Sequence, residues 1–298
     1  MSLFALFGAL ELGLIFSLVA LGVFISFRLL RFPDLTVDGS FPLGGAVGAV
    51  SIAAGMDPFL ATFLAALAGA GAGIITAVLN VHLKIMDLLA SILMMIALYS
   101  INLRIMGGPN IPLIMEPTIF TVLLPTALEE YDYILRPVLL VILVLAIKLL
   151  IDAYFSTKQG LAIRATGSNP RMARAQGVNT GWMVILGMAI SNALVALAGA
   201  LFAQTQGGAD ISMGIGTIVI GLAAVIVGES ILPARRLIFA TLAVILGAIV
   251  YRLFIALALN SEFIGLAAQD LNLLTAILVT IALVIPLLKK RFFKAKRK

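Results

Sequence analysis

The chain has 298 residues, of which 62% are hydrophobic and only 11% are charged, and its mean hydropathy is +1.17. An average soluble domain carries about 25% charged residues, so this composition excludes an ordinary soluble protein and indicates one that crosses a membrane repeatedly. The formal net charge is +6, but seven of the twenty Lys and Arg lie in the tail KKRFFKAKRK, which argues against a nucleic-acid-binding surface. The absence of cysteine excludes disulfides and thiolate metal sites.

Apolar segments of membrane-spanning character recur along the whole chain. They predict an all-α, polytopic membrane protein of about nine transmembrane helices (eight to ten) in a single domain over residues 1–298. The second segment is short and contains proline and several glycines, so we expect a broken or re-entrant helix there. The segments are residues 3–27, 41–56, 58–80, 86–105, 134–153, 181–204, 213–229, 236–258 and 268–288.

The distribution of basic residues predicts the orientation, because Lys and Arg gather in cytoplasmic loops. If the C-terminus is cytoplasmic, sixteen of the twenty Lys and Arg fall on the inner side, three fall on the outer side, and Lys148 lies within a span. We therefore expect the N-terminus outside and the C-terminus inside. Residues 289–298 then form a basic cytoplasmic tail that meets anionic lipid headgroups.

Two parts of the chain share a pattern. Residues 41–80 and 214–250 each contain a Gly-rich span, a short turn with a proline (Pro58 and Pro233), and a second apolar span with a late glycine. The second copy begins five spans after the first, so it is inverted in the membrane. Inverted repeats are a common way to build an alternating-access transporter.

One basic stretch interrupts the apolar sequence on the predicted cytoplasmic side, GLAIRATGSNPRMARAQGVN at residues 160–179. Asn169 as N-cap, Pro170 at the first helical position and Gly177 as the end predict a short helix over residues 169–177. So short a helix is not stable alone in water, and we expect it to dock on a partner; a solvated positive loop is the alternative. The residues expected to take part are Gly160, Arg164, Gly167, Asn169, Pro170, Arg171, Met172, Ala173, Arg174 and Gly177.

Few polar residues lie within the apolar segments, and these are candidates for a translocation path. A charge within a span, such as Glu11, is costly and often functional, although Glu11 could equally be protonated or paired with another helix. The stretch FPDLTVDGSFPLGG at residues 32–45 re-enters the membrane, where irregular backbone survives only inside protein or beside a water-filled cavity; a plain cytoplasmic turn is the alternative. Asparagines in spans could also simply bridge helices. The candidates are Glu11, Asp38, Gly39, Ser40, Asn80 and Asn192.

Nothing in the sequence indicates catalysis by this chain. His82 is the single histidine, which argues against His-based metal sites and catalytic triads. The pattern GxxxxGK[ST] does not occur, so we expect no ATP-binding loop, and no cofactor or metal site, in this chain.

Two stretches resemble a known family: Ala9 to Ala49, beginning ALELGLIF, and Lys158 to Gln204, beginning KQGLAIRATGSNPRM. They are similar to the membrane-spanning permease of bacterial ABC importers of the branched-chain amino acid and ribose group, and most similar to a subgroup linked with tryptophan or other amino acids. The resemblance implies the inverted repeat of type II importers and a homodimer of permeases in the bacterial inner membrane. It also implies two ATPase subunits that bind ATP and Mg²⁺, an extracytoplasmic solute-binding protein, and a cytoplasmic coupling segment at residues 157–180.

Other classes of protein remain open at this point. An ion-coupled secondary transporter needs a membrane-buried ionisable relay, for which Glu11 and Asp38 are the available residues. A passive channel leaves residues 160–179 without a role. The transmembrane scaffold of a vitamin importer is a closer rival, because it also uses short coupling helices that contain arginine. An ATPase that co-purifies with the chain would favour an ABC system over the secondary transporter or channel.

Overall fold

A computed structural model describes residues 3–114, 116–124, 131–234 and 236–259, together with residues 277 and 280. The ninth predicted span, 268–288, falls outside this range apart from those two residues, and the basic tail 289–298 falls outside it completely. In chain order the elements are α1 (Leu3–Val23), the π-helical turn η1 (Phe24–Leu29), α2 (Val37–Ala53), α3 (Pro58–Val81), α4 (Asp87–Met106), β1 (Asn110–Pro112), α5 (Ile119–Leu123), α6 (Asp132–Ser156), α7 (Lys158–Ser168), α8 (Pro170–Ala175), α9 (Thr180–Gln206), β2 (Gly208–Asp210), the 3₁₀ turn η3 (Ile211–Gly214), α10 (Thr217–Ile231) and α11 (Leu237–Leu259).

The prediction of an all-α, polytopic membrane protein is confirmed. Within the described residues, seven helices are long and apolar enough to cross a membrane, and α2 is a shorter apolar helix of 17 residues. The first eight predicted segments therefore all correspond to helices. One small antiparallel sheet departs from the all-helical picture: β1 pairs with β2, with Ile111 opposite Ala209, and joins the ends of α4 and α9.

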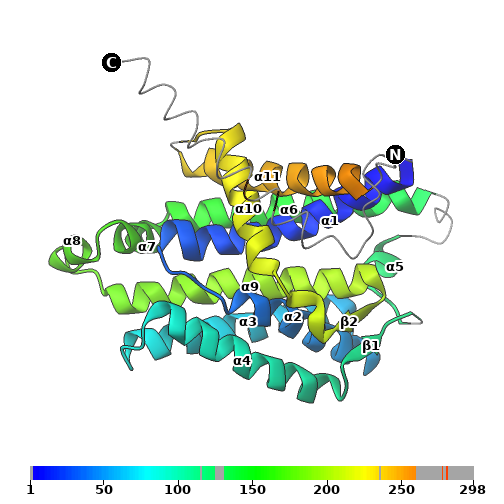
Figure 1. Cartoon of the computed structure of the whole chain (residues 1–298), viewed down its shortest axis with the longest axis horizontal. Coiled ribbons are helices and arrows are strands. Elements are labelled where there is room, and N and C mark those ends of the chain that lie inside the picture. The colour runs from blue at the N-terminus through cyan, green and yellow to red at the C-terminus, as the bar shows by residue number, and fades with distance from the viewer. Residues whose placement is uncertain are drawn as a thin grey trace.

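The long helix α9 runs through the middle of the bundle, with α2 and α3 along one side of it (Figure 1). Small residues allow this close packing. A Cβ at Gly73 of α3 would overlap the Met188 carbonyl of α9, and one at Gly44 of α2 would overlap the Ala196 carbonyl. In a membrane, where lipid tails are as apolar as leucine, such close backbone approach is a main source of helix association.

The packing partners show the exchange that an inverted repeat predicts. In the first unit, α1, α2 and α3, and in the last unit, α9, α10 and α11, equivalent helices swap partners: α3 packs along α9, and α11 packs along α1. Likewise α2 packs on α9, and α10 packs on α1. These contacts agree with the inverted repeat predicted from residues 41–80 and 214–250, with one more helix in each unit.

The second predicted span is a single helix rather than a broken one. It begins at Val37, four residues before the predicted start, and continues through Pro42 to Ala53. Asp38, Gly39 and Ser40 consequently lie in its first turns and not in an irregular linker. At 1.5 Å per residue its 17 residues span about 26 Å, less than the roughly 30 Å of hydrocarbon in a bilayer.

Candidate functional site

A buried group of polar side chains, which we call the central polar cluster, joins the linker before α2 to α9. Asp34 is 1% exposed, its Oδ1 accepts the Thr36 backbone N–H at 2.9 Å, and its Oδ2 accepts Asn192 Nδ2 at 2.8 Å. Asn192 lies near the middle of α9, and its Oδ1 accepts the Ser40 hydroxyl at 2.7 Å. The Thr36 and Thr76 hydroxyls share a hydrogen bond of 2.9 Å that adds α3 to the cluster.

The cluster contains two of the predicted path residues, Ser40 and Asn192, and both are fully buried. Their mutual hydrogen bond agrees with the alternative reading, in which such residues bridge helices. Asp34 was noted in the re-entry stretch but was not chosen as a candidate. The available signal was local: Asp two residues before a threonine at a helix start is a typical turn pattern, in which the carboxylate accepts the N–H two residues ahead.

Asp38 makes different contacts from Asp34. Its Oδ1 accepts the backbone N–H of Ile218 at 2.7 Å, and its Oδ2 accepts that of Gly216 at 3.3 Å. These two N–H groups open α10, whose own N-cap residue, Gly216, provides no capping side chain. A carboxylate is favourable there, because a helix N-terminus carries unpaired donors and a partial positive charge. Asp38, at the start of α2, therefore caps the start of α10.

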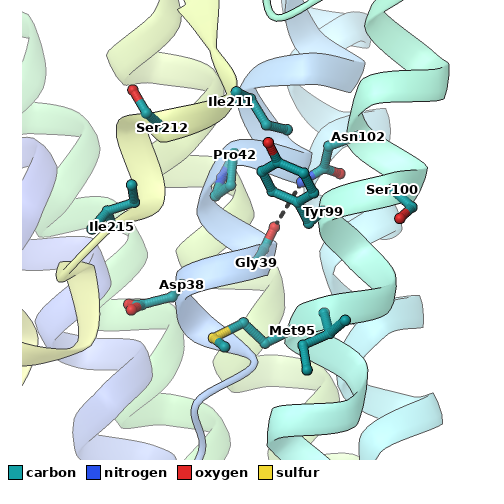
Figure 2. A pocket seen from close by; sticks show the side chains of 11 residues that line it. Asp38, Gly39, Pro42, Met95, Tyr99, Ser100, Asn102, Ile211, Ser212 and Ile215 are labelled. Carbon is teal, nitrogen blue, oxygen red and sulfur yellow. Dashed lines mark hydrogen bonds between the residues drawn. The ribbon is translucent and has the colours of Figure 1, made fainter.

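A pocket of about 510 Å³ lies next to this contact, between α2, α4 and η3, and we call it the α2–α4 pocket. Figure 2 shows Tyr99 and Asn102 of α4 on one side and Ile215 on the other, with the Asp38 carboxylate directed toward the segment of Ile215. Of the predicted path residues, Asp38 and Gly39 line it. Tyr99 and Asn102 were not predicted, because neither stands out in an apolar helix until the fold is known.

The remaining path candidates, Glu11 and Asn80, do not line the pocket. Glu11 lies in α1, and the charged residues that act on it are Arg136 and Asp132, themselves an ion pair of 2.5 Å in α6. Asn80 Nδ2 donates to the Ile85 carbonyl at 2.8 Å, and so stabilises the turn from α3 to α4. The structure thus separates the six candidates into four places: the central polar cluster, the α2–α4 pocket, the contact of α1 with α6, and the turn from α3 to α4.

The coupling segment, defined here as α7 and α8, has the predicted short helix. The Asn169 side chain accepts the Met172 N–H at 3.1 Å, Pro170 is the first helical residue, and Gly177 follows the helix end with φ of +80°. The residues before it form a helix of their own, α7. Figure 1 shows the two helices projecting from the end of the bundle opposite the N-terminus.

Glycine at position 167 brings α7 directly onto the end of the first membrane helix. A Cβ there would overlap the Leu29 carbonyl at the end of η1. On the other side of η1, Arg28 Nε lies 2.8 Å from Glu229 Oε1 near the end of α10. The coupling segment, η1 and α10 therefore form a continuous series of contacts.

Comparison with known proteins now assigns the family. The family model described as branched-chain amino acid transport system / permease component matches residues 5–288. The chain belongs to this permease family. It is 40% identical over 267 residues to the tyrosine transport system permease protein of Clostridioides difficile (strain R20291), covering 90% of this chain and 86% of that protein.

A second relative is an uncharacterized protein of Rickettsia prowazekii (strain Madrid E), 36% identical over 279 residues, which are 92% of this chain and 95% of that protein. No solved structure matches the chain significantly. These findings confirm the resemblance to ABC importer permeases read from the sequence, and the permease is a multi-pass membrane protein. In the part of the permease that the structure describes, no group of three or more His, Cys, Asp or Glu could hold a metal ion.

Proposed function

We propose that this permease is the translocating subunit of an ATP-driven, binding-protein-dependent importer that moves an amino acid inward by alternating access. Two identical copies form the membrane part in the bacterial inner membrane, a solute-binding protein delivers the solute from outside, and two ATPase subunits bind ATP and Mg²⁺ on the cytoplasmic side. The Clostridioides difficile relative is named for tyrosine transport, which supports an aromatic amino acid as the solute.

The observation that carries the proposal is the exposed short helix α8. In this helix of six residues, Ala173 packs against the rest of the protein and is only 4% exposed. Met172 is 59% exposed, and Arg171 and Arg174 are also exposed. Met offers adaptable apolar contact and Arg offers directed bonds to carboxylates, so this face suits a protein partner. Because Ala173 faces inward, Met172 rather than Ala173 is the informative position for testing the docking.

The contacts behind α8 support a route from the ATPase to the membrane helices. A displacement of α7 acts on η1, because Gly167 rests on the Leu29 carbonyl, and η1 is joined to α10 by the pair Arg28 and Glu229. Single π-helical turns of this kind are frequent at functional sites. Force applied at α8 thereby reaches α10, the helix that Asp38 caps.

The proposal fixes the orientation of the chain. The coupling segment is cytoplasmic, the N-terminus is outside and the C-terminus is inside, in agreement with the distribution of basic residues. Reporter fusions at residue 298 and in the loop 106–133 test this orientation. They should report opposite sides of the membrane, and a result with both on one side would contradict it.

The function is tested with the permease, its ATPase and its binding protein reconstituted in proteoliposomes. We expect uptake of labelled tyrosine to require ATP and the binding protein, and to survive ionophores that collapse ion gradients. Met172→Asp should reduce ATP-driven uptake by at least about tenfold, because a charge replaces an apolar docking contact.

The matched control for this experiment is Met86→Asp. Met86 is 74% exposed and is the N-cap residue of α4, a position where aspartate is favourable, so this variant should transport normally. Uptake that persists without ATP and is lost with ionophores would instead indicate an ion-coupled transporter. Normal uptake and normal ATPase binding by Met172→Asp would disprove the docking role.

A further inference from the structure

We propose that the α2–α4 pocket is a solute site within the permease, where Oδ1 of Asn102 accepts a hydrogen bond from the ammonium group of the amino acid. The class of solute rests on the proposed function, whereas the site itself rests on the geometry described below. The site is one that the amino acid occupies after it leaves the binding protein.

The wall of the pocket includes a residue with an unpartnered hydrogen-bond acceptor, Asn102. Asn102 is fully buried in α4, and its Nδ2 donates to the Gly39 carbonyl at 3.1 Å, which fixes the orientation of the amide. Its Oδ1 is buried and has no hydrogen-bond partner among the residues that the structure describes. An unpartnered buried acceptor is costly, so a ligand that donates to it is favoured. Asn102 lines the pocket, so a donor that enters the pocket lies beside this amide.

The charged groups that line the pocket favour a cationic ligand. Among the described residues that line it, Asp38 is the only carboxylic acid, and none is Lys or Arg. The Asp38 carboxylate is held in place by the Gly216 and Ile218 N–H groups, so its position in the wall is fixed. A cationic group is attracted to such a wall and an isolated anionic group is repelled.

The volume and the apolar lining of the α2–α4 pocket also suit an amino acid. The volume of about 510 Å³ lies within the range of about 300–1,000 Å³ that is usual for small-molecule sites. Met95, Ile96 and Ile215 supply apolar contact, and the Tyr99 ring lies across the centre of the view in Figure 2. A few polar groups in an apolar wall suit a molecule with one ammonium group and an apolar or aromatic side chain.

The test uses the natural absence of cysteine. Ser100→Cys places a thiol on the pocket wall, and Ala54→Cys, on the exposed turn after α2, serves as the matched control. The complete transporter in nanodiscs, without nucleotide, is labelled with a polar maleimide in the presence of L-phenylalanine, phenethylamine or 3-phenylpropionate. The first two carry the ammonium group and should slow labelling of Ser100→Cys at saturation, whereas 3-phenylpropionate should not, and labelling of Ala54→Cys should not change.

Two further variants, made in the Ser100→Cys background, test Asn102 itself. Asn102→Leu removes the acceptor and should weaken protection of the pocket thiol by phenethylamine by about tenfold or more. Asn102→Asp restores an acceptor with a negative charge and should keep or strengthen that protection, so a loss in both variants together with normal expression would overturn the role of Oδ1. This readout needs no ATP, so it separates failure of the site from failure of the proposed function.

Three other outcomes of the labelling experiment would overturn the proposal. Equal labelling with and without all three compounds would overturn the solute site. Reaction of the pocket thiol with an apolar but not a polar maleimide would show that lipid occupies the pocket, and would also overturn it. Labelling that is blocked in the dimer regardless of added compound would assign the pocket to the second copy of the chain instead.

Discussion

The short helices α2 and α10 hold equivalent places in the predicted inverted repeat, but their starts are held differently. The start of α2 is fixed by its own linker, because Asp34 is buried, accepts the Thr36 N–H and is itself bound by Asn192 of α9. The start of α10 has no capping side chain of its own and depends on Asp38 from the other repeat. The start of α2 is therefore part of the buried core, whereas the start of α10 is held by one side chain from the other unit.

The difference is sharper because both units begin with the same local turn. Asp34 accepts the N–H of Thr36, and Asp210 accepts the N–H of Ser212 at 2.7 Å. In the first unit this turn is buried and leads directly into the helix, whereas in the second Ser212 is exposed and η3 intervenes before α10 begins. The same sequence pattern therefore gives α2 a buried start and leaves α10 with a start that a separate residue caps. Unwinding the start of α10 should cost less free energy than unwinding the start of α2.

The largest expected effect is on the stability of the central polar cluster. Asp34→Ala leaves the Thr36 N–H and Asn192 Nδ2 without their buried acceptor, and we expect a loss of about 3 kcal/mol in the free energy of unfolding. The matched change Asp38→Ala removes a partly exposed cap and should cost only about 1 kcal/mol. Thermal unfolding of the two variants in detergent measures the difference, and equal losses would contradict the asymmetry between the two starts.

The smallest expected effect is at the C-terminal end of α10. The pair Arg28 and Glu229 has side-chain exposures of 60% and 36%, so a double-mutant cycle with alanine should give a coupling free energy of only about 0.5 kcal/mol. We expect ATP-driven uptake to fall more than stability does, since the pair links η1 to α10. A coupling energy of several kcal/mol would instead show that this end of α10 is anchored as firmly as α2.

Much of the fold was predictable because it depends on local patterns. Apolar runs predicted eight of the helices, and Asn169, Pro170 and Gly177 predicted α8 with its cap and its end. The α2 start was predicted four residues late, because the polar run of Asp38, Gly39 and Ser40 resembles a loop unless its buried partners are known. Polar residues in an apolar sequence identify possible sites but not which of them meet.

The pocket was not predictable for the same reason. Asp38 and Gly216 are 178 residues apart in the chain, and Asn102 and Gly39 are 63 apart. No spacing or periodicity in one sequence connects such pairs. Ser40 and Asn192 were chosen as candidates for a translocation path, and only the fold shows that they bond to each other rather than line the pocket.

Hydrogen exchange at the two helix starts tests the central comparison most directly. Mass spectrometry of peptides that cover residues 36–42 and 216–222 should show that Asp38→Ala speeds exchange at the start of α10 and leaves the start of α2 unchanged. Asp34→Ala should speed exchange at the start of α2, because the acceptor of the Thr36 N–H is lost. If Asp38→Ala leaves exchange over residues 216–222 as in the unaltered permease, Asp38 does not hold α10, and the account of two differently anchored helix starts is wrong.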